Sequence, residues 1–493
     1  MTTSRSAAAA AQLALDLGPD PSGGSDPAGA PTPSRLRPDL PVLSIAPEWK
    51  DQQRLWGHAF HPMCSYLASF PAALSHAFVG RYSRRGDVVL DPFSGRGTTP
   101  LQACAEGRIG VGNDLNPFAH LLTSAKVEPA TRADAATRLA ALRLGWASTS
   151  ERWIELANRV LAPTLSSAGA PTAPGTPGAT LVPAAGSGPD GAPVEPVPAE
   201  VAVAFHPRTL AQLLFVRSSL RLADRTDRFL AAALTGILHG KSASYLSELM
   251  PNTFSMAPRY VRDFAARTAF ASPDRDVFDG LERKLGRLYR DPLPSSAGIA
   301  LLGDARDVAS RARAALRARG LPERARLVVT SPPYLRTVKY GYYNWLRTWF
   351  LGFDARAIDA TLDDAHHREP YLAFLREVLA DLREILADDA IVVLVIGDVE
   401  TDRGRPIRGA VGLAERVWES AAEPAGYRLA GIALDDVAAQ RKMTKLWGAE
   451  AGRATKTDRI VVLGATEAGR RRALAAAGTP IDWDWPPHGL RAL

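Results

Sequence analysis

Short runs of β-branched and aliphatic residues recur along the chain and are separated by amphipathic stretches, the pattern that crossover helices leave between strands of a parallel sheet. Seven runs fit this description: 88–90, 109–111, 299–302, 327–329, 391–396, 429–434 and 460–463. The last two lack a clear crossover helix between them, so we expect an antiparallel hairpin at the sheet edge. The pattern predicts a doubly wound, Rossmann-like α/β fold with about seven mostly parallel strands.

The alternation of strand and helix is lost between 126 and 294, where helical periodicity prevails. We interpret this interval as a largely helical insertion into the sheet domain. It contains a stretch rich in Pro, Gly and Ser over about 162–200, which cannot bury enough apolar surface to fold and is expected to be a disordered linker.

The remaining chain divides around this insertion. Residues 43–125 and 295–465 are expected to form the two parts of the sheet domain. The Ala-, Pro- and Gly-rich stretch 1–42 is predicted to be a disordered tail, and 466–493 a C-terminal tail.

Composition excludes several classes of protein. No apolar run approaches the ~20 residues needed to span a bilayer, which indicates a cytoplasmic protein without membrane attachment. The two cysteines, Cys64 and Cys104, cannot build a disulfide framework, and the nine scattered histidines lack the spacing of a metal site. A net charge of +7 and a pI near 9.5 admit a polyanionic partner such as nucleic acid.

The segment GDVVLDPFSGRGTTPLQACAEG, residues 86–107, places an acid and two glycines directly after a predicted strand. Ligands of open α/β sheets bind at such a strand end, where glycines allow close approach and the next helix presents free N–H groups. No Lys-Ser/Thr pair closes the loop, which therefore suits a cationic cofactor without phosphate, its amino group paired with Asp91. Asp114 follows the next strand, 17 residues beyond Gly97, a spacing suited to ribose hydroxyls. The alternative is that this segment is a tight turn that binds no ligand.

A second pattern, LVVTSPPY over 327–334, ends a fully apolar strand with two prolines that fix an extended backbone. A base amine is a poor nucleophile because its lone pair is delocalised into the ring. The Ser331 oxygen and the Pro332 carbonyl could accept its N–H groups and so favour the nucleophilic form, while the Tyr334 ring stacks on an extruded base. A plain strand-ending turn is the alternative.

Both patterns resemble motifs of the amino-methylating DNA methyltransferases. DPFSGRGTT resembles their cofactor loop, and FHPMCSYLASFPAALSHAFV resembles the segment called motif X. The resemblance implies S-adenosyl-L-methionine as cofactor, with Phe70 near its methionine carboxylate, Asp114 at its ribose and Asp304, in ALLGDARDV, beside its adenine. The implied loop residues are Asp91, Pro92, Phe93, Gly95, Gly97 and Thr98.

The catalytic set implied by the (S/D/N)-PP-(Y/F) signature is Ser331, Pro332, Pro333 and Tyr334. The TSPPY form favours the cytosine N4 amine of DNA, and adenine N6 remains the alternative. Absence of a Pro-Cys pair disfavours ring-carbon methylation. An RNA base methyltransferase and a non-catalytic nucleic-acid-binding module are the rival functions, and a cognate restriction or defence-system component is a candidate partner beside DNA.

The chain departs from the family pattern in two ways. The cofactor motifs precede the catalytic motif, the reverse of the order common among TSPPY enzymes, and an insertion of about 170 residues lies between Asp114 and Asp304. We treat it as a candidate target-recognition region whose cations contact phosphates or guanine edges, against the alternative of a helical packing module. The cations concerned are Arg208, Arg217, Arg221, Lys241, Arg259 and Arg262. Downstream of the catalytic motif, Tyr340, Tyr342 and Tyr343 could form a base-stacking surface, whereas Trp345, Trp349 and Phe350 fall at the helical spacing of a core.

Overall fold

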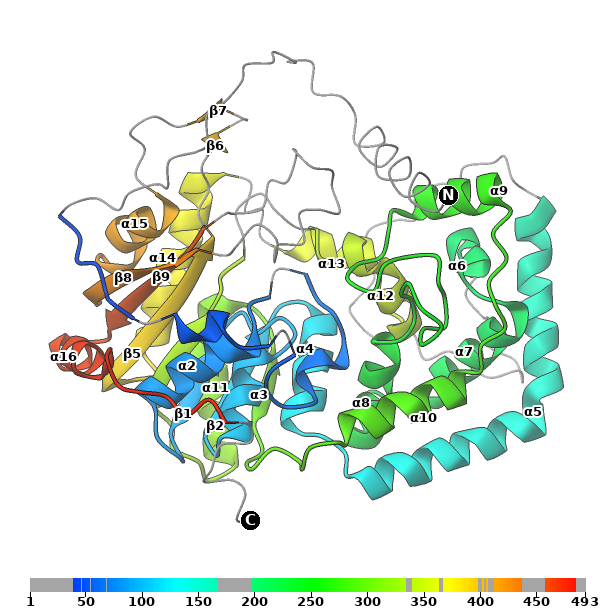
Figure 1. Ribbon diagram of the computed structural model, residues 1–493, viewed down its shortest axis with the longest axis horizontal. Helices are drawn as coiled ribbons and strands as arrows, with labels where there is room; N and C mark the ends of the chain where they lie inside the picture. Colours follow the sequence, from blue (N-terminus) through cyan, green and yellow to red (C-terminus); the bar gives the residue numbers. More distant parts are fainter. Residues whose placement is uncertain are drawn as a thin grey trace.

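A computed structural model provides the structure, and it describes residues 39–45, 47–53, 55–67, 69–166, 197–333, 339–362, 367–397, 401–402, 405–406, 412–436 and 457–484. A seven-stranded sheet and a cluster of helices lie side by side (Figure 1). The strands of the sheet, in the order β3-β2-β1-β4-β5-β9-β8, are β1 (Val88–Asp91), β2 (Ile109–Asp114), β3 (Ile299–Leu302), β4 (Ala325–Thr330), β5 (Leu386–Gly397), β8 (Arg428–Asp436) and β9 (Thr457–Gly464). All seven predicted runs lie within these strands.

Strands β1 to β5 are parallel, and β9 pairs antiparallel with both β5 and β8. The sheet is therefore mostly parallel with an antiparallel edge, which confirms the predicted fold class and the hairpin of β8 with β9. The chain order reverses between β1 and β4, the strands at the centre of the sheet. Ligands of doubly wound folds bind at the carboxyl ends of strands next to such a switch point.

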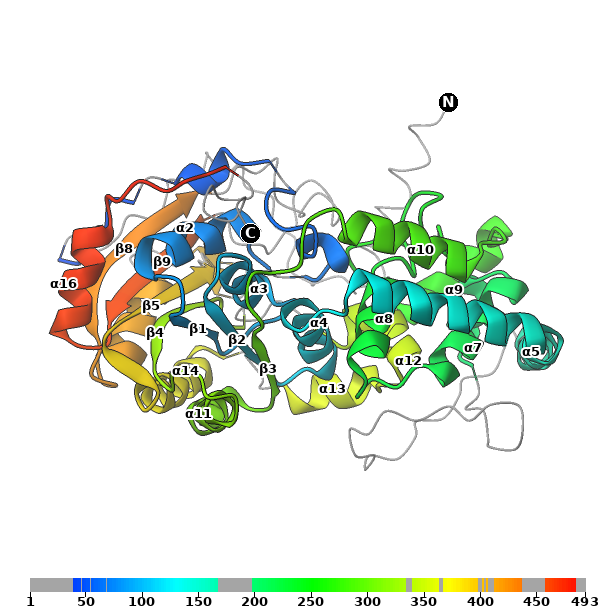
Figure 2. The same cartoon turned by 90° about the horizontal axis from the view of Figure 1, so that it is seen from below.

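Helices cover both faces of the sheet, because side chains alternate along each strand. Val89, Leu327 and Val393 point to the face covered by α2 (Ala72–Tyr82) and α16 (Glu467–Ala476). Leu90, Val328 and Val392 point to the face covered by α11 (Val308–Ala318) and α14 (Arg368–Arg383) (Figure 2). The other elements near the sheet are η1 (Glu48–Lys50), η2 (His61–Met63), α3 (Thr98–Ala105), α4 (Pro117–Val127), η3 (Ala305–Asp307), α15 (Leu413–Val417), the π-helical η5 (Trp418–Ala422), β6 (Thr401–Asp402) and β7 (Arg405–Pro406).

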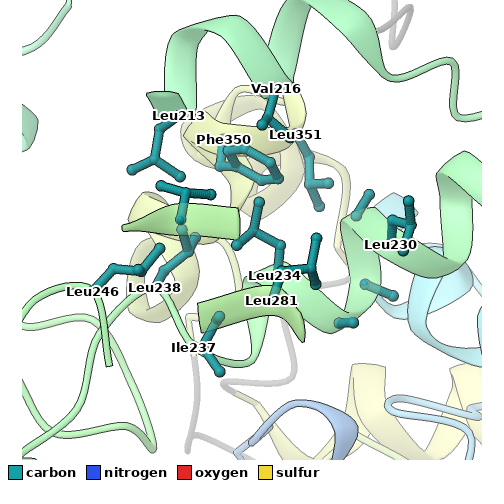
Figure 3. Packing of buried hydrophobic residues seen from close by; sticks show 14 of the residues in the cluster. Leu213, Val216, Leu230, Leu234, Ile237, Leu238, Leu246, Leu281, Phe350 and Leu351 are labelled. Carbon is teal, nitrogen blue, oxygen red and sulfur yellow. The ribbon is translucent and has the colours of Figure 1, made fainter. Parts of the chain in front are cut away.

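The insertion is helical, as predicted, and has an apolar core of its own (Figure 3). Its helices are α5 (Arg132–Ser166), α6 (Ala199–Ala204), α7 (Pro207–Ser219), α8 (Arg225–Thr235), α9 (Pro258–Thr268) and α10 (Val277–Leu288). Leu213 of α7, Leu234 of α8 and Leu281 of α10 meet in this core. The predicted linker overlaps the ends of α5 and α6, and residues 167–196 lie outside the described residues.

Helix α12 (Trp345–Leu351) follows the catalytic motif in sequence but packs into the core of the insertion, where Phe350 and Leu351 lie beside Val216 of α7 (Figure 3). Trp345 and Phe350 are buried and Trp349 is half-buried, so the helical spacing correctly indicated a packing helix. Helix α12 therefore anchors the segment that follows the catalytic motif in the core of the insertion. The short elements around it are η4 (Tyr342–Asn344) and α13 (Ala355–Thr361).

Two chain ends differ from the expected tails. Within 466–493, α16 packs on the sheet with Ala473 buried, and the chain beyond it adds Ile481 and Trp483 to the same core. The few large apolar side chains of this Ala- and Arg-rich helix concealed its buried stripe. At the other end, Leu43 N donates to Ile432 O (3.1 Å) and Ile432 N to Pro41 O (3.0 Å), so residues 41–43 already pair with the edge strand β8, whereas 1–38 lie outside the described residues.

Both cysteines are buried free thiols, and Cys104 is a core residue of α3. Throughout the described part of the chain, no helix combines the length and apolar character needed to cross a membrane.

Candidate active site

The loop after β1 is built around two glycines in the left-handed region. Gly95 has φ 50° and Gly97 has φ 75°, and a Cβ on Gly97 would lie 2.8 Å from Thr123 Oγ1. Any larger residue would push the loop away from α4, so the glycine is needed for close packing. Helix α3 then begins at Thr98 with its N-terminus directed at the loop. This is the predicted strand–loop–helix arrangement, with Pro92 and Phe93 in the turn between β1 and Gly95.

Asp91, the last residue of β1, is 2% exposed and forms no ion pair with any cation in the described part of the chain. Its Oδ1 accepts hydrogen bonds from Phe93 N (3.1 Å) and from Thr330 Oγ1 (2.6 Å). Burial raises the pKa of Asp91 to about 7, although both hydrogen bonds favour the charged form. A buried carboxylate without a counter-ion is suited to a cationic ligand.

Asp114 lies at the end of β2, the strand adjacent to β1. Gly95 N donates to its Oδ2 (2.8 Å) and Asn116 N to its Oδ1 (2.9 Å), so the same carboxylate fixes the glycine loop and the start of α4. Burial raises the pKa of Asp114 to about 6. The structure thus brings the two predicted acids to neighbouring strand ends on one side of the loop.

Phe70 and Thr98 are joined to the loop through a residue that the sequence did not single out. The Arg96 guanidinium donates to Phe70 O (3.3 Å) and to Thr98 Oγ1 (3.2 Å), which ties the segment before α2 to the loop. Burial lowers the pKa of Arg96 to about 10. The signal in the sequence was the position of Arg96 between the two glycines.

Asp304 follows β3 and lies at the same edge of the sheet, because Gly303 N donates to Asp114 O (3.0 Å). Its carboxylate caps η3 through Arg306 N (2.9 Å) and pairs with the Arg306 guanidinium (2.6 Å). These hydrogen bonds lower the pKa of Asp304. The capping role is therefore present, and an adenine contact stays a prediction that would share the carboxylate with Arg306.

An aromatic pair borders this edge. The rings of Phe93 and Phe374 lie 5.7 Å apart, and the Arg306 guanidinium carbon lies 5.5 Å from the centroid of Phe374. Loop residue Phe93 thereby connects β1 with α14.

The catalytic motif follows β4, the other neighbour of β1. Leu90 pairs with Val328, so Thr330 at the end of β4 reaches Asp91, and the motif Ser331-Pro332-Pro333 continues from it. The Ser331 Oγ atom is buried and makes no hydrogen bond within the described part of the chain. A buried hydroxyl without a protein partner is free to bond a substrate. Tyr334 lies outside the described residues.

Two further residues were missed by sequence reasoning. Thr330 reads as an ordinary strand residue, but its hydroxyl links the cofactor loop to the catalytic motif. Tyr66 stacks on Tyr340 (centroids 5.7 Å apart, 19° between planes), and its hydroxyl accepts from Asn116 Nδ2 (3.1 Å). Tyr66 thus connects the chain after the catalytic motif with the strand end that holds Asp114.

The insertion's cations are largely engaged within the protein. Arg208 pairs with Asp274 (3.0 Å) and Asp276 (2.5 Å), and Arg217 lies over the Trp349 ring (5.4 Å). Arg262 pairs with Glu200, Arg259 pairs with Asp263, and Lys241 donates to the Leu249 carbonyl. Most of these cations therefore have structural partners, and a recognition role for the insertion stays a prediction. No group of three metal-ligating side chains gathers in the described ranges.

Comparison with known proteins locates the resemblance in the segment that builds this loop. Residues 44–124 match the family model N6_N4_Mtase, described as DNA methylase. Residues 44–124 therefore resemble the amino-methylating DNA methyltransferases. The type II methyltransferase M.MjaII of Methanocaldococcus jannaschii is 35% identical over 71 residues, and M.MthZI of Methanothermobacter thermautotrophicus is 43% identical over 49 residues.

These matches cover a small part of each protein: 14% of this chain and 13% of M.MjaII, and 10% of this chain and 14% of M.MthZI. Among solved structures, the rRNA methyltransferase aviRa of Streptomyces viridochromogenes aligns over 88% of this chain and 93% of its own, with 10% identity. Its TM-score of 0.28 is too low to support any conclusion.

Proposed function

We propose that the protein is an S-adenosylmethionine-dependent DNA methyltransferase that modifies an exocyclic base amine, cytosine N4 in preference to adenine N6. The hydrogen bond from Thr330 Oγ1 to Asp91 Oδ1 carries this proposal. It joins the ends of the adjacent strands β1 and β4, from which the glycine loop and the SPP motif continue. In the described part of the chain the Ser331 hydroxyl beside it has no partner. Its preference for cytosine rests on the TSPPY resemblance, and the matched relatives support DNA as substrate.

The residues present fit the proposed cofactor. Asp91, a buried carboxylate that has no counter-ion among the described residues, suits the positively charged methionine part, and Asp114 suits the ribose hydroxyls. Gly97 keeps the loop close to α4, where even a Cβ would collide with Thr123. When bound, S-adenosylmethionine supplies an electrophilic methyl group.

The chain's own contribution to the reaction would be orientation and hydrogen-bond acceptance. Ser331 Oγ and the Pro332 carbonyl would accept the two N–H groups of the base amine, which localises the nitrogen lone pair for attack. One proton must leave once the nitrogen has become cationic. The Ser331 oxygen would accept a hydrogen bond from that N–H group, and the proton would pass to solvent water, since the methylated amine is neutral at neutral pH. The two prolines fix the backbone, so this geometry exists before the base arrives.

Cytoplasmic location and a partner from a restriction or defence system are part of the same proposal. The location is inferred from the apolar pattern of the sequence, and the partner from the family resemblance.

Incubation of purified protein with tritium-labelled S-adenosylmethionine and unmethylated bacterial DNA tests the proposal. Digestion to nucleosides and mass spectrometry should show N4-methylcytosine, which should form ~10²-fold more slowly with Ser331→Ala. N6-methyladenine instead would correct the base and retain the mechanism. Label in structured RNA but not in DNA, or no transfer to either, would refute the proposal.

A further inference from the structure

Tyr342 is the one aromatic side chain among the exposed large apolar residues of the described chain, with 39% of its surface accessible. It lies just after the catalytic motif, in η4. An exposed tyrosine is not unusual in itself. What distinguishes this one is that the backbone and the rings around it hold it in place.

The backbone at Tyr342 is fixed by α13. Asp359 accepts hydrogen bonds from Gly341 N (2.7 Å) and Tyr342 N (2.9 Å) with its two carboxylate oxygens. A Cβ on Gly341 would lie 2.0 Å from the Ala355 carbonyl oxygen, so the turn packs directly on the helix and requires glycine. The backbone that carries Tyr342 therefore has a single position relative to α13.

The ring is supported from the side. Tyr342 and Tyr343 meet edge to face, with centroids 5.6 Å apart and 79° between planes, and Tyr343 meets Phe254 of the insertion in the same way (5.8 Å, 81°). Ser255 N donates to Tyr343 O (2.6 Å) and holds the insertion loop against η4. Tyr342, Tyr343 and Phe254 thus form an aromatic row, to which the catalytic segment contributes the two tyrosines and the insertion contributes the phenylalanine.

This row borders the proposed reaction centre. Tyr340, two residues before Tyr342, stacks on Tyr66, whose hydroxyl bonds Asn116 beside Asp114. Two exposed cations belong to the same two segments: Lys339 precedes Tyr342 in the chain, and Arg356 lies on α13, the helix whose Asp359 binds the Tyr342 backbone. Within the described ranges neither has a carboxylate partner, in contrast to most cations of the insertion.

We propose that Tyr342 stacks on a base of the nucleic-acid strand that flanks the target base, with Lys339 and Arg356 at the adjoining phosphates and Asp359 as its positioning residue. A ring held in place during folding loses little further entropy when a base stacks on it, and stacking tolerates any base. Free cations beside an exposed ring fit a strand whose bases alternate with phosphates. The inference rests on the proposed function for its substrate class.

Fluorescence anisotropy with a fluorescein-labelled 30-nucleotide single strand of mixed sequence, and with its duplex, measures the contact without requiring catalysis. Tyr342→Ala should weaken binding to the single strand about 5- to 100-fold, the range for losing one stacked base. Tyr342→Phe keeps the ring and should bind as the unmodified protein does. Leu144→Ala removes a 73% exposed side chain on α5, a helix of the insertion that carries no residue of the aromatic row, and serves as the matched control.

A second measurement distinguishes loss of the stacking contact from a folding defect in the variants. Photo-crosslinking of the same strand substituted with 5-iodouracil should attach it to Tyr342, as mapped by peptide mass spectrometry, and Asp359→Ala should reduce this crosslink although it retains the ring. Equal binding by Tyr342→Ala and the unmodified protein, or a crosslink that does not involve Tyr342, overturns the inference.

The two proposals fail differently. If the unmodified protein binds the strand in a Tyr342-dependent way but transfers no methyl group, the inference holds as a binding site and the enzymatic function is wrong. If it methylates DNA while Tyr342→Ala binds and reacts normally, the function holds and the inference is wrong. Absence of binding to both probes contradicts both.

Discussion

Replacing Asp91 by asparagine should stabilise the protein at high pH while it damages cofactor binding. Burial raises the pKa of Asp91 to about 7, from an ordinary value of 3.8. Its folded-state pKa lies above its unfolded value, so the charged form opposes folding: the cost is absent below about pH 4, grows as pH rises, and is complete above about pH 7. At about 1.4 kcal/mol for each pKa unit, the full cost is about 4 kcal/mol. Asparagine keeps an oxygen that can accept from Thr330 and Phe93 and carries no charge.

Urea unfolding of the cofactor-free protein at pH 5 and pH 8 measures this effect. Between these pH values the carboxyl of Asp91 passes from mostly protonated to mostly charged in the folded state. The advantage of Asp91→Asn in free energy of unfolding should therefore grow by about 3 kcal/mol. Asp388→Asn, at an exposed aspartate near the amino end of β5, is the matched control and should show no such growth. An equal difference at the two pH values would refute the idea that Asp91 is a buried, uncompensated charge.

Two further outcomes are expected at this site, and a third concerns the Pro- and Gly-rich stretch of the insertion. Thr330→Val removes the hydroxyl that donates to Asp91, so affinity for S-adenosylmethionine, measured by calorimetry, should fall roughly tenfold. Circular dichroism should show little change in secondary structure. Unchanged affinity would show that the hydrogen bond from Thr330 to Asp91 does not contribute to cofactor binding. Affinity of the unmodified protein should fall as pH drops from 8 to 5.5. Asp91, with a pKa of about 7, must release its proton to pair with the cationic part of the cofactor, and Asp114, with a pKa of about 6, must release its proton to accept from the ribose hydroxyls with both oxygens. Calorimetry in buffers of different ionisation enthalpy should register this proton release, and its absence would contradict these roles of the two carboxylates. Deleting 167–196, whose Pro- and Gly-rich composition provides little for a core, should change the melting temperature by no more than about 2 °C in a thermal scan; a larger drop would mean that this stretch contributes to the folded core.

The sheet could be predicted because its signal is local. Each parallel strand is buried on both faces, so it appears as a short aliphatic run, and all seven runs lie within strands. The packing partner of helix α12 could not be predicted in this way. The spacing of Trp345 and Phe350 predicted a buried stripe, but a stripe does not specify its partner, and the partner proved to be α7 and α8 of the insertion. Helix α16 was missed because alanines give a weak apolar contrast.

The candidate site, like the fold, could be predicted only where its signal is local in the sequence. Asp91, Asp114 and the glycines were predictable, since each follows a strand and the carboxyl ends of neighbouring parallel strands meet at one edge. The bond from Thr330 to Asp91 spans residues far apart in sequence and depends on the register of β1 against β4, which no local pattern reveals. Asp304 illustrates an ambiguity that sequence cannot resolve, because a capping residue and a ligand-binding carboxylate occupy the same strand-end position.

The central claim is that the Ser331 hydroxyl acts on a base amine held beside the cofactor loop. Single-molecule sequencing of plasmid DNA from a methylation-deficient host that expresses the protein tests it most directly, with nucleoside mass spectrometry to identify the base. The unmodified protein should mark one defined sequence with N4-methylcytosine, and Ser331→Ala, expressed at the same level, should slow single-turnover transfer ~10²-fold or more while cofactor affinity stays the same. Equal transfer rates for Ser331→Ala and the unmodified protein would contradict the account.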